Sequence, residues 1–384
     1  MVEIKIMAKE HIPEEIVMKI LVKLTVKSVV RFRSLTKNYN ALTRETSFIT
    51  EHLSRSIVKA KNKPNFLVFH QINNRFFISM VSEDQKSQRT IDLKPPFIFT
   101  QSVNNIIAHA HSNGIIYLEL LDGVPQNPNP KILWNPATRE VKFLPFPPPT
   151  RHTHCTFVHV VHGFGIDPKT DDYKVVNIVV GAEIFSELSE KLIGQVYSLH
   201  FDSWKVVNVG VFARYIANSM FNAYLNGVYH WLAESGDVEF VLCFDMSDDV
   251  FWKLNLPQGI FEEEKNKFYI RHSNIFVLND RVGYVREYMH SKFHFDIWMM
   301  NEYGVEGSWM RMFKIVRGPC PEILLEFWNK DDDDVFVLGR EEYQPLVSYK
   351  IGEQQVVIEF SLNLGIEQRV FRYVESVVPL SGGS

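Results

Sequence analysis

The side chains with the clearest ligand chemistry lie in one histidine-rich stretch, RHTHCTFVHVVH. On a strand, side chains two residues apart share a face. One face then holds His152, His154 and His162, and the other holds Cys155 and His159. A zinc site needs ligands that converge on one point, and only His152 and His154 do so locally. We therefore expect no metal and no other cofactor, and interpret the stretch as a solvated loop followed by a strand.

Other catalytic patterns are missing from the sequence. It contains no nucleophile elbow, no Cys-x-x-Cys pair and no phosphate-cradling glycine-rich loop. Gly163 and Gly165 flank Phe164, but no helical pattern follows them. A nucleotide-binding glycine loop is followed by a helix, so we do not expect a nucleotide site here. We predict a protein without intrinsic enzyme activity. The alternative is a β-propeller enzyme carrying a helical cap, which would need a polar, metal- or carboxylate-lined channel.

Runs of acidic residues fall in predicted loops of the strand-rich part of the chain. They have two interpretations. They could be solvated loop tips, or a rim that attracts a basic protein and speeds encounter. In the second case they are candidate substrate-binding residues: Glu262, Glu263, Glu264, Asp331, Asp332, Asp333 and Asp334.

The elements that would position any site differ between the two ends of the chain. Residues 12–53 predict short amphipathic helices, the first beginning at Pro13, with further helices near 26–35, 37–43 and from about Ser47 onward. Apolar residues recur at three- and four-residue spacing in the first of these helices, on one stripe. Such a small unit needs a surface to pack on. The stripe is therefore either a cap resting on the same chain or a docking surface for another protein.

After a basic connector at 57–64, short apolar and aromatic runs replace the helical pattern. Asn113-Gly114 and Asn226-Gly227 each open a strand that carries a tyrosine, and hairpins recur at roughly 45 to 50 residues. This period predicts a β-propeller of about six blades. The alternative is a large β-sandwich or two stacked β-domains.

Composition narrows the function classes. Residues 1–60 hold eleven Lys or Arg and six Asp or Glu, whereas the whole chain has a net charge of −4, so two modules with different partners are indicated. No basic stripe points to nucleic acid, and no apolar run is long enough to span a membrane. Three widely spaced cysteines suit a reducing compartment, and we expect the cytosol or the nucleus.

The run IPEEIVMKILVKLTVKSVVRFRSLTKNY resembles the F-box of plant F-box proteins, with an acidic pair, an apolar helix, VKSVVRF and a later lysine at matching offsets. Ile12 stands where leucine is usual, Thr25 where a second proline is usual, and Tyr39 where tryptophan is usual. The resemblance implies that the segment binds the Skp-family adaptor of a cullin–RING ubiquitin ligase. The implied adaptor contacts are Ile12, Pro13, Ile16, Ile20, Leu21, Leu24, Val29, Arg31 and Phe32. Packing inside the helical unit is the alternative role for each.

The remainder resembles the F-box-associated domain of the same proteins, which is similar to the kelch-type propeller. The matching residues are Trp134-Asn135-Pro136-Ala137-Thr138-Arg139, Gly163-Phe164-Gly165, Asp171 to Val176, Asn226-Gly227 with Trp231, and Tyr373 to Ser376. The implied domains are an F-box at 8–56, a linker at 57–64 and a propeller at 65–378.

The resemblance implies that the chain is a substrate-recognition subunit of an SCF-type ligase, in which the propeller binds a protein target. It is similar to the S-locus F-box and S-locus F-box-like group, and this similarity implies a pistil S-RNase as the target, in self-incompatibility. A scaffold that binds the adaptor without delivering a substrate is a further alternative.

Overall fold

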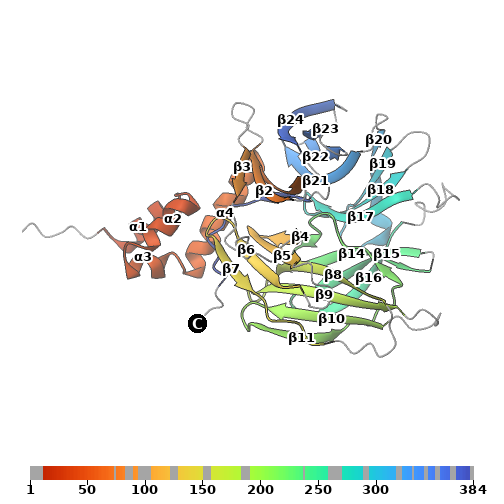
Figure 1. Cartoon of the computed structure of the whole chain (residues 1–384), viewed down its shortest axis with the longest axis horizontal. Helices are drawn as coiled ribbons and strands as arrows, with labels where there is room; N and C mark the ends of the chain where they lie inside the picture. The colour runs from red at the N-terminus through yellow and green to blue at the C-terminus, as the bar shows by residue number, and fades with distance from the viewer. Residues whose placement is uncertain are drawn as a thin grey trace, which may run out of the picture.

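The computed structural model begins with a helical unit that projects from a much larger body of strands (Figure 1). Its four helices are α1 (Glu14–Leu21), α2 (Val26–Arg33), α3 (Lys37–Leu42) and α4 (Thr46–Asn62). The structure describes these residues: 12–72, 75–82, 90–93, 105–121, 129–149, 157–182, 191–236, 238–257, 270–288, 294–316, 322–330, 333–340, 345–350, 355–363 and 369–380.

Local chemistry explains where these helices begin. Glu14 and Glu15 occupy the first turn of α1, where their charge suits the helix dipole. Thr25 is the N-cap of α2 and its hydroxyl accepts a hydrogen bond from the Ser28 amide. Thr36 caps α3 in the same way, through the Tyr39 amide. Threonine at position 25 therefore starts α2 although the related motif has proline there.

In the described part of the chain, the strands form six antiparallel sheets. The first sheet has the order β25-β1-β2-β3, from β1 (Asn65–Ile72), β2 (Arg75–Ser82), β3 (Thr90–Leu93) and β25 (Arg369–Tyr373). The second contains β4 (Asn105–Ser112), β5 (Ile115–Leu121), β6 (Lys131–Asn135) and β7 (Glu140–Phe143). The third contains β8 (Phe157–Ile166), β9 (Tyr173–Ala182), β10 (Lys191–Ser198) and β11 (Ser203–Asn208).

The other three sheets follow the same plan. The fourth contains β12 (Tyr215–Ile216), β13 (Tyr224–Leu225), β14 (Val228–Ser235), β15 (Val238–Asp245) and β16 (Val250–Asn255). The fifth contains β17 (Ile270–Leu278), β18 (Arg281–Tyr288), β19 (His294–Met300) and β20 (Trp309–Val316). The sixth contains β21 (Glu322–Lys330), β22 (Asp333–Arg340), β23 (Pro345–Lys350) and β24 (Gln355–Asn363).

The sheets are arranged around a ring (Figure 1). Strand β4 contacts β8, β8 contacts β14, β14 contacts β17, β17 contacts β21, and β21 contacts β25. The ring closes because β25, from the C-terminal end of the chain, pairs with β1 and completes the first sheet. The expected β-propeller preceded by a few helices is confirmed, and the sandwich alternative is wrong.

The two Asn-Gly turns have the backbone that their sequence predicts. Asn113 and Gly114 have φ of 49° and 79°, and Asn226 and Gly227 have φ of 46° and 89°. Positive φ at both central residues is the requirement of the tight hairpin turn that Asn-Gly favours. These turns connect β4 to β5 and β13 to β14.

The largest apolar core lies among the middle sheets. Trp231, Tyr117, Tyr197 and Tyr229 are fully buried in it. Gly163 makes room for one of these rings, because a Cβ at this position would lie 2.5 Å from a ring carbon of Trp231. Among the described residues, none of the helices combines the length and apolarity needed to cross a lipid bilayer.

The stretch expected as a connector, 57–64, is mostly helical, because α4 continues to Asn62 and β1 begins at Asn65. Ala60 is buried and Ile57 is half-buried, so the helix stays packed along this stretch. The fourth helix also begins at Thr46, one residue before the expected start. Only two residues, Lys63 and Pro64, thus separate the last helix from the first strand of the propeller.

Candidate docking face

Helix α1 and the residues before it carry an exposed apolar edge, which we call the α1 edge: Ile12, Ile16 and Ile20. Their side chains are 55%, 44% and 52% exposed. A spacing of four residues places Ile16 and Ile20 above one another on one face of the helix. Large apolar side chains in a row on a surface indicate a site where another molecule binds.

The structure separates the predicted contact residues by burial. Pro13 and Arg31 are exposed like the α1 edge, while Leu24 and Phe32 are half-buried. Leu21 and Val29 are buried, at 2% and 0% exposure, in the core of the helical unit. Those two side chains pack in the core beneath the docking face, so a partner would not contact them in this conformation.

Aromatic packing is retained where the sequence departs from the related motif. The rings of Phe32 and Tyr39 meet edge to face with centroids 6.0 Å apart. This is a favourable arrangement for two aromatic rings. Tyr39 therefore supports Phe32 from α3.

The core of the helical unit is completed by a distant segment, residues 374–380, which we call the C-terminal strap. Val377 is fully buried among the apolar side chains of α1, α2 and α4, including Leu21, Val26 and Phe48. The Asn135 amide donates to the carbonyls of Ser376 (3.0 Å) and Val378 (2.9 Å). The strap is thus held between the helices and the β6–β7 turn.

No pattern in the sequence predicts the strap, although both ends of the contact lie in motifs that carry the family resemblance. Asn135 lies in the WNPATR motif and the strap begins at Val374, next to the closing Tyr373. The turn also contributes Ala137 to the helical core. A hint in the sequence was Asn135 itself, because a polar side chain between Trp134 and Pro136 needs hydrogen-bond acceptors if it is buried. The fold supplies those acceptors from the strap.

Several sequence-predicted residues lie outside the described part of the chain. Glu262, Glu263 and Glu264 belong to this group, as do Asp331 and Asp332. Asp333 and Asp334 begin β22, and their side chains are outside the description.

The histidine-rich stretch divides in a similar way. His152, His154 and Cys155 are outside the description. His159 and His162 lie on β8. The predicted pairing of His152 with His154 therefore stays untested.

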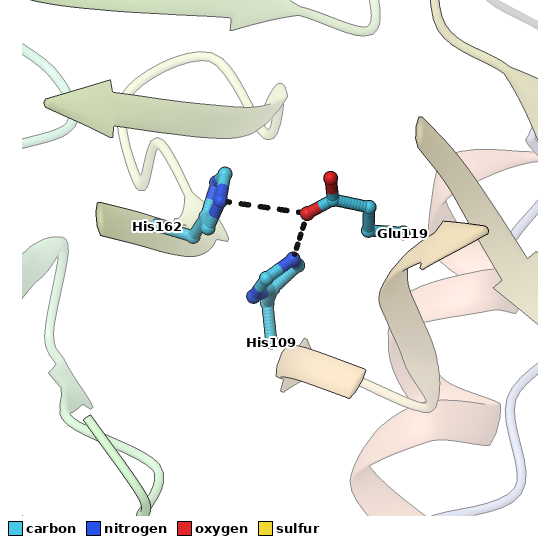
Figure 2. Close-up of side chains that lie close together, drawn as sticks. All are labelled: His109, Glu119 and His162. Atoms are coloured by element: carbon cyan, nitrogen blue, oxygen red, sulfur yellow. Dashed lines mark hydrogen bonds and ion pairs between the residues drawn. The ribbon is translucent and has the colours of Figure 1, made fainter. Parts of the chain in front are cut away.

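His162 instead meets two residues that sequence spacing did not associate with it, and Figure 2 shows the three side chains converging. The Glu119 Oε2 atom lies 2.9 Å from His109 Nε2 and 3.8 Å from His162 Nε2. Spacing within the histidine-rich stretch could not predict this cluster, because its residues come from β4, β5 and β8, and the ring sets the contact between β4 and β8.

The chain matches the family model described as the F-box associated beta propeller domain over residues 32–380. It is 22% identical to the putative F-box protein At3g25460 of Arabidopsis thaliana, over 98% of this chain and all of that protein. It is 26% identical to the F-box protein CPR1 of the same plant, over 79% of this chain and 73% of that protein. For the putative F-box protein At3g16210, also from Arabidopsis thaliana, identity is 25% over 65% of this chain and 63% of the relative.

Among solved structures, a prolyl endopeptidase covers 91% of this chain and 53% of its own, with 9% identity and a TM-score of 0.42. A similarity at that level carries no argument about function. The family match, in contrast, covers most of the chain, including the propeller and part of the helical unit. The protein therefore belongs to the family of plant F-box proteins that carry an F-box associated beta propeller domain.

Proposed function

We propose that this protein is the substrate-recognition subunit of an SCF-type cullin–RING ubiquitin ligase. The helical unit binds the Skp-family adaptor, and through it the cullin and RING subunits, while the propeller binds a protein target. The family supports this reading. The single observation that carries it is the exposure of the α1 edge, since Ile16 and Ile20 are not covered by the propeller.

On this proposal the predicted adaptor residues have different roles, which depend on how exposed each side chain is. Ile12, Ile16 and Ile20 enter apolar pockets of the adaptor, and because each is already about half-buried, covering the rest would stabilise the complex by about 1 kcal/mol per side chain. Pro13, Leu24, Arg31 and Phe32 contribute from the surrounding surface. Leu21 and Val29 act indirectly, by holding the helices in position.

The protein itself carries out no chemistry on this proposal. It holds the target close to the ubiquitin-charged enzyme and raises the effective concentration of target lysines. The two-residue join between α4 and β1 and the C-terminal strap support this role, because both hold the helical unit against the propeller. A fixed distance between adaptor and target favours productive encounters.

Finer assignments follow from the same proposal. The F-box comprises residues 8–56, and the propeller, residues 65–378, is kelch-like with the six sheets as its six blades. The protein acts in the cytosol or the nucleus. Its acidic residues, at 262–264 and 331–334, attract a basic target, for which a pistil S-RNase is the candidate.

The adaptor proposal is tested with charged variants of the α1 edge. Ile16→Asp and Ile20→Asp should each weaken adaptor binding at least tenfold, because a carboxylate would be desolvated in an apolar interface. Val58→Asp is the matched control, since Val58 is 61% exposed on α4 and lies outside the α1 edge. Unchanged adaptor binding in both α1 variants would reject the proposed face.

The ligase role needs a second measurement. Purification of the wild-type protein with the adaptor should recover ubiquitylated client proteins, and the Ile20→Asp protein should not. An adaptor complex without clients would favour the scaffold, and a protein that never binds the adaptor would favour the enzyme alternative. For a captured client, binding that does not weaken at high salt would remove the electrostatic role of the acidic loops.

A further inference from the structure

Two imidazoles and one carboxylate converge where the second and third sheets meet. His109 lies on β4, Glu119 on β5 and His162 on β8, and their ligand atoms all lie within 4.8 Å of one another (Figure 2). We propose that His109, Glu119 and His162 form a binding site for a zinc-type divalent cation. Two imidazoles and one carboxylate are one of the common three-ligand sets for zinc, with water in the fourth position.

The spacing of the ligand atoms suits such an ion. With metal–ligand bonds of about 2.0–2.2 Å, ligand atoms around a tetrahedral zinc lie about 3.3–3.5 Å apart. The two distances from Glu119 Oε2, 2.9 Å to His109 Nε2 and 3.8 Å to His162 Nε2, bracket that value.

His162 is held in the form that a metal requires. Its Nδ1 lies 2.8 Å from the Asn177 side-chain oxygen, so the Nδ1–H donates to that oxygen. The second nitrogen, Nε2, then carries a lone pair and faces the Glu119 carboxylate. A lone pair and a carboxylate repel each other, and a cation between them would turn the repulsion into attraction. Hydrogen bonding of the distal nitrogen is also how proteins orient metal-binding histidines.

Glu119 is anchored through one oxygen and presents the other to the two histidines. Asn129 donates to Oε1 at 2.9 Å, and the Lys131 ammonium lies 3.5 Å from the same atom. Oε2 faces the two histidines. This division would make the carboxylate a one-oxygen ligand with a fixed orientation.

His109 is aimed at the site by an irregularity of its strand. The pairing of β4 with β5 shifts register between Ala108 and Ala110, so His109 is the extra residue of a β-bulge. A bulge turns a side chain out of the regular alternation and is frequent beside functional sites. Without the ion, the Nε2–H of His109 donates to Glu119. With the ion bound, that proton moves to Nδ1 and Nε2 becomes the ligand.

The protonation states agree with the geometry. Burial lowers the pKa of both His109 and His162, so both imidazoles are neutral at neutral pH. Burial alone would raise the pKa of Glu119, but the hydrogen bond from His109 and the charge of Lys131 hold that pKa below its usual range. Neutral imidazoles and an ionised carboxylate are the forms that bind a metal.

The test uses the full-length protein, stripped of metal with a chelator and then given Zn²⁺ or Co²⁺. The wild type should retain one equivalent of zinc after gel filtration. The cobalt form should show visible absorption bands of four-coordinate geometry. Glu119→Gln and His162→Ala should each weaken zinc binding at least tenfold. The glutamine variant keeps the shape of the side chain, so it remains informative if the alanine variant fails to fold.

His159→Ala is the matched control. His159 lies on the same strand, half-buried, with its ring stacked on Tyr215 and away from the three ligands. It should bind zinc like the wild type. The proposal is overturned if the wild type retains no zinc, if Glu119→Gln binds as tightly as the wild type, or if His159→Ala loses as much affinity as His162→Ala. Adaptor binding is measured separately and does not depend on this outcome.

Discussion

The guanidinium group of Arg33, on α2, donates a hydrogen bond of 3.1 Å to the carbonyl of Val377, which follows it by 344 residues. The same Arg33 side chain also donates to the carbonyl and the hydroxyl oxygen of Thr43, at 3.0 and 3.1 Å. One half-buried arginine thus connects two helices of the F-box to the C-terminal strap. The orientation of the F-box on the propeller depends on such contacts.

Arg33→Ala should lower the free energy of unfolding by about 2 kcal/mol, because hydrogen bonds from a charged donor to two carbonyls are lost. Chemical denaturation followed by circular dichroism measures the change. Arg31→Ala is the control on the same helix, since Arg31 is exposed and should change stability by less than about 0.5 kcal/mol. Adaptor affinity should show the reverse order, falling for Arg31→Ala more than for Arg33→Ala. Equal stability of the two variants would contradict the role of Arg33.

Asn135→Ala should destabilise the protein by about 2 kcal/mol, because two buried strap carbonyls lose their donor. The side-chain oxygen of Asn135 also accepts from the Ala137 amide, so the β6–β7 turn loses a contact as well. Limited proteolysis should show earlier cleavage near the C-terminus of this variant. Asn255→Ala, on an exposed position of β16, should behave like the wild type in both assays. A strap that stays protected in Asn135→Ala would count against this account.

Phe371→Ala should weaken the closure of the ring. Phe371 is 2% exposed on β25, and its ring packs edge to face on Phe69 of β1 with centroids 5.5 Å apart. Truncation of a buried phenylalanine to alanine lowers the free energy of unfolding by about 3–5 kcal/mol. Thermal unfolding should therefore occur at a clearly lower temperature. Phe201→Ala removes a ring that is 75% exposed and should leave the transition nearly unchanged.

His230 should make stability depend on pH. Burial lowers its pKa to about 4, although a hydrogen bond to the Ala223 carbonyl opposes part of the shift. In the unfolded chain, histidine titrates at about 6.5, so the unfolded state binds a proton first as the pH falls. The stability contribution is therefore present above pH 6.5 and is lost between about 6.5 and 4.

From pH 7 to pH 5, the wild type should lose about 2 kcal/mol more than His230→Gln. Urea unfolding at both pH values measures this difference, in which the other buried histidines cancel. His272→Gln, at an exposed position of β17, should show the wild-type loss. If His230→Gln and the wild type lose stability in parallel, His230 is not the group that titrates.

Local chemistry explains why much of the fold could be predicted from the sequence. Helix α1 begins at Glu14 with an acidic first turn, and α2 follows the capping residue Thr25, and both are local signals for a helix start. The Asn-Gly pair at 113 and 114 forms a tight turn because few other residues tolerate positive φ twice in succession. The aromatic strands and their spacing indicated a propeller, which the chain forms.

The candidate sites depended more on the tertiary structure. Ile16, Ile20 and Leu21 share one apolar stripe in the sequence, and only packing decided that Leu21 faces inward and the two isoleucines face outward. The helical form of the join was also decided by packing, because Ile57 and Ala60 extend α4 through a stretch whose lysines and proline indicated only a connector.

Local patterns were enough to predict the F-box helices and the hairpins, because each is formed by residues close together in the chain. The same local motifs carried the resemblance to the family. Only the tertiary structure decided that Val377 fills the F-box core, that Asn135 holds the strap, and that His109 and Glu119 meet His162. The physical reason is ring closure. Pairing of β25 with β1 brings the C-terminus back to the helices, and contact between β4 and β8 brings together side chains that no local spacing relates.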